Sequence, residues 1–187
     1  MTPDDRLDEL WSKIDAFTAR VNERYPGALA CAEGCSDCCH RELTLTTIEA
    51  ERVAALVMDL PPEARAELAE RAASGEPCVA LGANGACAIY AARPVVCRSH
   101  GLPLRFVDPG NEGDPSRARR ALPILDVCPK NFVGHDLGSI DPACVMDQHT
   151  LSVLLGAIDT LFARETGACE AGRYPLRDVV AAACDEG

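Results

Sequence analysis

Four cysteines lie close together near the N-terminus, in the stretch CAEGCSDCCH at residues 31–40. They are Cys31, Cys35, Cys38 and Cys39. Zinc and iron–sulfur clusters are both held by thiolates, and each centre takes four ligands. Ligands two to four residues apart can reach one ion, because a tight turn directs both side chains inward. The spacing therefore predicts a metal centre that begins in this stretch and is completed elsewhere in the chain.

Four further cysteines complete a set of eight ligands. Cys78, Cys87 and Cys97 lie in CVALGANGACAIYAARPVVCR, and Cys128 lies in DVCPKNF. All eight thiols fall in segments whose pattern predicts turns or irregular chain. The predicted metal ligands are Cys31, Cys35, Cys38, Cys39, Cys78, Cys87, Cys97 and Cys128.

The ligand count leaves the number of centres open. Eight thiols match two four-thiolate sites, or one centre with spare ligands. Because neighbouring side chains diverge, the adjacent Cys38 and Cys39 more easily serve two centres, with a shared or bridging arrangement as the alternative. His100 closes the sequence CRSH and is an alternative ligand in a mixed site. The expected cofactor is zinc or an iron–sulfur cluster, of the 4Fe-4S type if the metal is iron.

The remaining cysteines, Cys144, Cys169 and Cys184, lie in or beside helical patterns near the C-terminus. A lone cysteine in a helix usually behaves as a small buried hydrophobe, so we expect these three to pack. Arginines also flank the predicted ligands. Arg93 and Arg98 could donate hydrogen bonds to sulfur and offset the net −2 of a four-thiolate zinc site, or be ordinary surface residues.

Composition narrows the classes of protein and partner. Eighteen basic and 29 acidic residues give a net charge of −11, which repels phosphate backbones and argues against nucleic acid. No apolar run reaches the roughly 20 residues that a membrane-spanning helix needs, and the acidic start MTPDDRLDEL does not resemble a signal peptide. These features predict a cytoplasmic protein that does not bind membranes. The 11 cysteines are then expected to be reduced rather than paired as disulfides.

Apolar periodicity predicts the elements that carry the cysteines. A stripe from Leu7 to Val21 predicts an N-terminal helix, and Thr46 with Glu49 gives a capping-box signature. Helices are expected over residues 7–21, 46–60, 63–75, 151–162 and 175–184, and short strands over 43–46, 102–107 and 121–128.

The middle of the chain differs from the rest in composition and in hydrophobic periodicity. Residues 76–103 are rich in Gly, Pro and Cys without long periodicity, so we expect them to be ordered by something other than a hydrophobic core. The fold class is mostly α: a single compact helical domain over residues 1–187, with an irregular cysteine-rich metal-binding centre and a short β-hairpin. The cysteine-cluster region, residues 31–133, is flanked by the N-terminal helix and the C-terminal helices.

The chain resembles the CxxCxxCC cysteine-cluster family, whose members are described as zinc- or iron-chelating. The resemblance covers residues 31–133 and is carried by CAEGCSDCC, by IYAARPVVCR at residues 89–98, and by CPKNF at Cys128. Three residues separate Cys31 from Cys35, where the family name implies two. The resemblance implies metal chelation, and it leaves the metal open.

Three functions follow from these observations. The first is a metal-binding cysteine-cluster protein that holds zinc or an iron–sulfur cluster. The second is a redox or group-transfer enzyme with Tyr90, Arg93 and Arg98 around an open coordination position of an iron–sulfur centre. The third is a module in which the metal organises a surface for a protein partner, which the sequence does not identify.

Overall fold

The computed structural model describes residues 1–187 except 33, 76–77, 108–122, 168–170 and 186–187. The α-helices of this part are α1 (Pro3–Arg24), α2 (Thr47–Met58), α3 (Pro62–Ser74), α4 (Val95–Ser99), α6 (Gln148–Thr166) and α7 (Leu176–Asp185). Short 3-10 helices are η1 (Tyr90–Ala92), η3 (Leu137–Ser139) and η4 (Pro142–Cys144). The strands are β1 (Thr44–Thr46), β2 (Leu104–Phe106), β3 (Ile124–Asp126), β4 (Met146–Asp147) and β5 (Arg173–Pro175). The mostly helical fold predicted from the sequence is confirmed.

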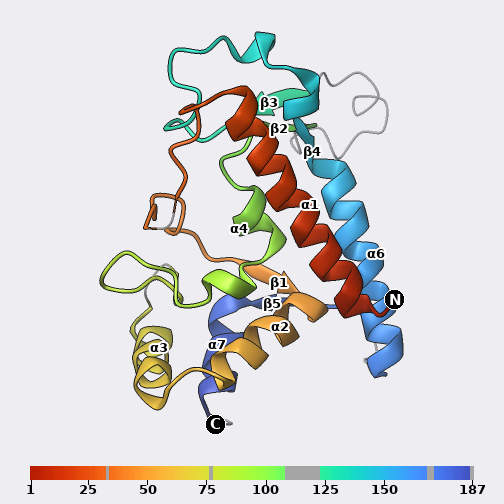
Figure 1. Cartoon of the computed structure of the whole chain (residues 1–187). Coiled ribbons are helices and arrows are strands. Elements are labelled where there is room, and N and C mark those ends of the chain that lie inside the picture. The colour runs from red at the N-terminus through yellow and green to blue at the C-terminus, as the bar shows by residue number, and fades with distance from the viewer. Residues whose placement is uncertain (33, 76–77, 108–122, 168–170, 186–187) are drawn as a thin grey trace.

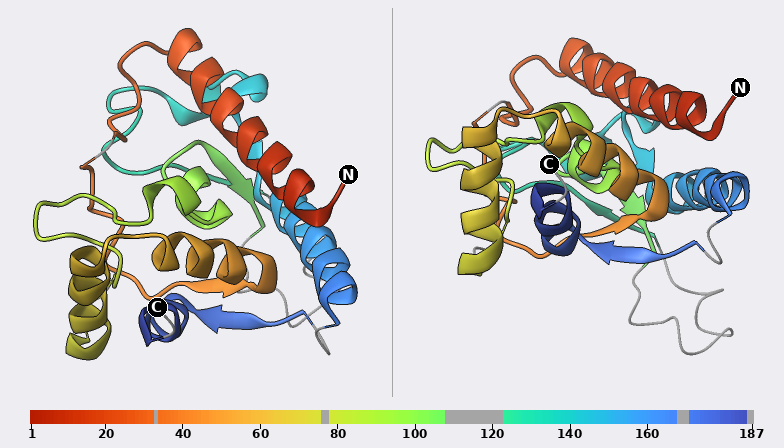
Figure 2. Two further views of the ribbon diagram at one scale, coloured as in Figure 1. Left: turned by 60° about the horizontal axis from the view of Figure 1, so that its bottom comes forward. Right: turned by 90° about the horizontal axis from the view of Figure 1, so that it is seen from below.

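Helix α1 is stabilised by a capped N-terminus and by the burial of its apolar face. The Thr2 backbone N–H donates to Asp5 Oδ2 at 2.8 Å, and the Asp5 N–H donates to Thr2 Oγ1 at 3.1 Å, which caps the first turn. The predicted stripe is buried from Leu7 to Val21. It packs against α6, which lies beside it in Figures 1 and 2.

The N-terminus of α2 is joined to α4 by one buried carboxylate. Glu49 is 3% exposed, and its Oε2 accepts hydrogen bonds from the Thr46 N–H at 3.1 Å and from the Thr46 hydroxyl at 2.9 Å. Its Oε1 accepts from the Val95 N–H at 2.8 Å. The predicted capping box is therefore present, and it also holds the first turn of the helix that carries Cys97.

The strands form two small sheets. β2 and β3 pair antiparallel, as the predicted hairpin requires, and β4 adds to β2 in parallel. β1 pairs antiparallel with β5, so residues near position 45 lie beside residues near position 174. Neither β4 nor β5 was predicted, because two- and three-residue strands carry no alternating pattern of their own.

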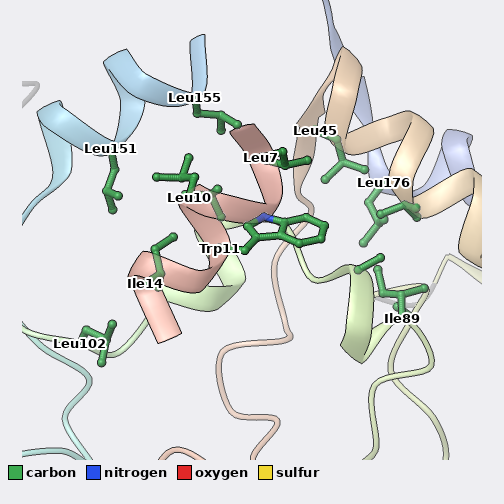
Figure 3. Close-up of a cluster of buried hydrophobic side chains, with 14 of the residues drawn as sticks. Leu7, Leu10, Trp11, Ile14, Leu45, Ile89, Leu102, Leu151, Leu155 and Leu176 are labelled. Atoms are coloured by element: carbon green, nitrogen blue, oxygen red, sulfur yellow. The ribbon is translucent and has the colours of Figure 1, made fainter. Parts of the chain in front are cut away.

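One hydrophobic cluster joins the two ends of the chain to its middle. Figure 3 shows Leu7, Leu10 and Ile14 of α1 on the side of Leu151 and Leu155 of α6, whereas Trp11 points toward Leu45 and Ile89. The cluster also includes these buried residues of the central region: Val79, Ala80, Ile89, Ala92, Val95 and Leu102. The expectation that residues 76–103 lack hydrophobic anchoring is thus wrong for the described part of that segment. Its apolar side chains are single residues between turns, so they escape a search for periodicity.

No helix in the described ranges is both long and apolar enough to cross a membrane.

Candidate metal centre

The first cysteine stretch is an irregular segment between α1 and β1. Its backbone forms two tight turns: the Cys35 N–H donates to Ala32 O at 3.0 Å, and the Cys39 N–H donates to Ser36 O at 2.8 Å. Figure 1 shows this segment on the same side of the molecule as the yellow-green loop that precedes α4. The two cysteine-rich parts of the sequence therefore face one another.

Cys31 lies against Cys128, 97 residues later in the chain, across Gly101. A Cβ atom built on Gly101 would lie 2.9 Å from Cys31 Sγ and 3.3 Å from Cys128 Cβ, so only glycine fits between them. Gly101 also has φ +89°, in the left-handed region that disfavours other residues. The sharp turn after α4 is what allows the two cysteines to approach.

Asn131 fixes this neighbourhood through hydrogen bonds. It is 3% exposed, and its Nδ2 donates to Cys31 Sγ at 3.2 Å and to Gly101 O at 2.6 Å. Its Oδ1 accepts from the Ala30 N–H at 2.8 Å. One amide thus ties together the three segments that bring Cys31 and Cys128 into proximity, as side chains around metal ligands commonly do.

Two further thiols, Cys35 and Cys38, lie close enough to Cys31 to affect its pKa. Partial burial raises the pKa of Cys31, the Asn131 hydrogen bond opposes that rise, and Cys128, Cys35 and Cys38 add to it. We call Cys31, Cys35, Cys38 and Cys128 the outer cluster. Lys130 forms an ion pair with Asp37, and the hydrogen bond that Lys130 donates to this carboxylate raises the pKa of Lys130, as do Cys35 and Cys128.

A cavity of about 260 Å³ lies beside the outer cluster. The cysteines in its wall are Cys35, Cys38, Cys39, Cys78, Cys87 and Cys97. Apolar side chains such as Ile89, Val96 and Leu176 form much of the rest, with Arg41 and Arg93 among the polar ones. Six of the eight predicted ligands thus border one space that is far larger than a single ion.

Within this wall, Cys39, Cys78, Cys87 and Cys97 form a second group, which we call the cavity cluster. Burial is the main cause that raises the pKa of Cys97 to about 12. The neighbouring thiols act in the same direction, and Cys78, Cys87 and Cys39 contribute more than Cys38. Burial and the thiols of Cys38, Cys78 and Cys87 raise the pKa of Cys39 to about 12. Burial also raises the pKa of Cys87, with Cys78 acting in the same direction.

Local structure positions the later members of the cavity cluster. Leu81 and Cys87 form an isolated antiparallel bridge, supported by the Ala88 N–H donating to Ala80 O at 2.8 Å and the Gly82 N–H donating to Ala86 O at 2.7 Å. This tight hairpin-like turn brings Cys87 toward Cys78. Cys97 lies on the short helix α4 and not in irregular chain as predicted, because the Glu49 carboxylate and Pro94 start a helical turn there.

The flanking arginines have different roles. Arg93 lines the cavity, stacks on the Tyr90 ring at 3.6 Å, and its charge lowers the pKa of Cys87. Arg98 instead donates to Arg93 O at 2.9 Å, to Ala91 O at 2.7 Å and to Asp15 Oδ2 at 3.1 Å, and lies over the Trp11 ring. Of the two predicted sulfur partners, only Arg93 acts on a thiol, whereas Arg98 fastens α4 to α1.

His100 is exposed and borders the cavity, so the structure leaves it beside the cysteines without a direct hydrogen bond to any of them in the described residues. Of the cysteines predicted to pack, Cys144 is 1% exposed within the core, and Cys184 is half-buried with its thiol donating to Arg65 O at 3.4 Å. Cys169 lies outside the described residues.

All ten cysteines in the described part of the chain are free, as expected for reduced thiols. Within that same part, no group of three or more His, Cys, Asp or Glu side chains stands in a geometry that could hold one ion. The thiols are gathered without being preassembled, so ligation would require their side chains to turn toward a common centre.

Sequence reasoning missed two residues of this region, Gly101 and Asn131. Asn131 lies within CPKNF, three residues after Cys128, and this proximity was the only available signal for it. Gly101 gave no signal, since its role depends on contacts with residues 70 positions before it and 27 after it.

Replacing Asn131 by Asp should weaken zinc binding at the outer cluster by about 10–100-fold, the usual cost of disturbing a residue that orients a metal ligand. The variant keeps the acceptor for Ala30 but loses the donor to Cys31 and places a negative charge beside a thiolate. Competition with a chromogenic zinc chelator measures the change. Asn22→Asp is the matched control, because this residue is exposed on α1 and is not in the cavity wall. Equal affinities for the two variants would contradict the role of Asn131.

Comparison with known proteins finds a family match over part of the chain. Residues 30–111 match the family model CxxCxxCC, described as "Putative zinc- or iron-chelating domain". Seven of the eight predicted ligands lie in the matched range, and Cys128 lies beyond it. No curated protein and no solved structure matches the chain.

Proposed function

We propose that this protein, whose residues 30–111 match a zinc- or iron-chelating domain, binds zinc or an iron–sulfur cluster through the thiolates of the outer and cavity clusters. The ligands are Cys31, Cys35, Cys38, Cys39, Cys78, Cys87, Cys97 and Cys128. If the metal is iron, the cluster is of the 4Fe-4S type, which takes four thiolates. The observation that carries the proposal is that free thiols from four separate parts of the sequence border one cavity and its rim.

The residues fit such a group in their chemistry. Soft thiolates favour zinc and iron–sulfur clusters over magnesium or calcium, and free thiols are available in each cluster. Each cluster also has a cation within electrostatic reach, Lys130 in the outer one and Arg93 in the cavity. A bound metal would bring positive charge that favours the thiolate form, and the cations would offset part of the remaining negative charge.

We further propose that residues 1–187 form one domain in a reducing compartment, the cytoplasm. The hydrophobic cluster that joins α1, α6 and the central region supports the first point. The free state of ten cysteines supports the second, because reduced thiols persist where glutathione and thioredoxin act.

The cavity favours a second candidate function, a redox or group-transfer enzyme. Tyr90 is 38% exposed at the cavity wall and carries Arg93 stacked on its ring, so a small substrate could meet a polar group beside the thiols. A closed four-thiolate site is inert, whereas a site with an open position is reactive. A visible absorption band that dithionite bleaches would favour this candidate, and a colourless zinc protein would argue against it.

The test of the metal-binding proposal is metal analysis of the full chain purified without oxygen. We expect at least one equivalent of zinc or iron per chain, with the ligand thiols shielded from a thiol reagent until a chelator is added. Fewer than one equivalent of any transition metal, together with eight freely titratable thiols, would contradict the proposal.

A further inference from the structure

We propose that the eight thiols form two separate four-thiolate centres, which divide between the adjacent residues Cys38 and Cys39. The outer cluster supplies one centre and the cavity cluster the other. This inference rests on the proposed function, and it goes further by fixing the number of centres and the ligands of each.

The first argument is that the two clusters are built by different parts of the fold. Cys31 and Cys128 are held together by Gly101 and Asn131, whose contacts involve none of the cavity cluster. The cavity cluster depends on the turn that contains the bridge between Leu81 and Cys87, and on α4. The two different sets of contacts indicate two sites.

The second argument is that an ion pair ties the loop of Cys35 and Cys38 to the segment of Cys128. Lys130, two residues after Cys128, pairs with Asp37, which lies between Cys35 and Cys38 in the sequence. Cys31 and Cys128 are not among the residues of the cavity wall, which includes all four members of the cavity cluster.

Cys38 and Cys39 lie where the two sets meet. The two residues also contact each other, because Cys38 raises the pKa of Cys39 ahead of Cys78 and Cys87, after burial. Adjacent side chains diverge, so one residue can enter each centre without the strain of holding the same ion. Because Cys35 and Cys38 also border the cavity, the competing arrangement is one fused centre with a bridging thiolate.

The third argument is charge. A zinc ion with four thiolates carries a net −2, so two centres would place −4 in a small volume. Cys35 and Cys128 of the outer cluster raise the pKa of Lys130, and the charge of Arg93 lowers the pKa of Cys87 of the cavity cluster. Each centre thus has its own basic residue within electrostatic reach.

The test is a titration of the metal-free full chain with Co²⁺ under anaerobic conditions, followed by the thiolate-to-cobalt absorption. We expect an end point of two equivalents for the wild type. Cys31→Ser/Cys128→Ser and Cys87→Ser/Cys97→Ser should each bind one equivalent. Cys184→Ser, which changes a thiol outside both clusters, should bind two.

Alkylation of unprotected thiols, read by mass spectrometry, identifies the ligands. In Cys31→Ser/Cys128→Ser loaded with one equivalent of Co²⁺, the protected thiols should be Cys39, Cys78, Cys87 and Cys97. The same footprint on the wild type with two equivalents should protect all eight, which makes the ligand assignment testable even if a variant folds poorly.

The possible outcomes separate the two proposals. No tight Co²⁺ binding by the wild type would overturn metal binding itself. A wild-type end point of one equivalent would leave metal binding intact and overturn the division into two centres. Two equivalents that are both lost in either double variant would indicate a fused centre and would also overturn the division.

Discussion

Lowering the pH from 8 to 7 should weaken the zinc association constant of the cavity cluster by about 10³-fold, because each thiol must lose a proton before it binds the metal. Three of the four thiols have raised pKa values: Cys39 and Cys97 at about 12, and Cys87 above the ordinary value of 9.0. These three remain protonated in the metal-free protein throughout this interval. Binding one zinc ion therefore releases at least three protons, and affinity falls by about a factor of ten per proton for each pH unit.

The measurement is competition with a chromogenic chelator, corrected for the chelator's own protonation, at several pH values between 6.5 and 8.5. The Cys31→Ser/Cys128→Ser variant restricts the measurement to the cavity cluster. A slope clearly below three protons per zinc would contradict ligation by these three protonated thiols.

Stability of the metal-free protein should depend on pH in the opposite direction. A thiol whose pKa is raised by folding contributes stability that is present below its unfolded pKa, near 9, and is lost as the pH rises toward 12. Alkaline pH thus strengthens zinc binding and weakens the metal-free fold.

Replacing Gly101 by Ala should reduce the zinc affinity of the outer cluster by about 10–10²-fold. The new Cβ would lie 2.9 Å from Cys31 Sγ and 3.3 Å from Cys128 Cβ, so the ligands must move apart. Overpacking of this kind costs about 1–3 kcal/mol. If this cost falls on the metal-bound state, it corresponds to the expected change, at about 1.4 kcal/mol for each factor of ten.

Gly134→Ala is the matched control for this variant. Gly134 has φ +80°, close to the +89° of Gly101, but a Cβ built there meets no atom within 4 Å. Both variants should therefore lose similar stability from backbone strain, whereas only Gly101→Ala should lose zinc affinity. A similar zinc affinity in both would show that the contact with Cys31 and Cys128 is unimportant.

The helices and the hairpin could be predicted because their signals are local. The apolar stripe from Leu7 to Val21 and the Thr46–Glu49 capping box both depend on residues within a few positions of one another. The pairing of β1 with β5 could not be predicted in this way. It joins residues about 130 positions apart, and the exposed sequence of β5 has no strand pattern.

Candidate ligands can be named from the sequence, but their arrangement cannot be predicted from it. Cysteine is chemically distinctive, so the eight predicted ligands could be named from sequence. Their division into two neighbourhoods depends on Gly101 and Asn131, whose importance comes from distances across the fold. The anchoring of the central segment by Ile89 and Val95 was missed for the same reason, since single apolar residues between turns form no period.

The contact between Arg98 and Trp11 gives the chain an intrinsic optical probe. Trp11 is the one tryptophan in the sequence, and its indole ring lies 4.4 Å from the guanidinium carbon of Arg98 and 5.2 Å from that of Arg52. Arg98 follows Cys97 directly, so a rearrangement of α4 alters the surroundings of the fluorophore. Emission from this single indole therefore reports on the junction between α1 and α4 without any attached label.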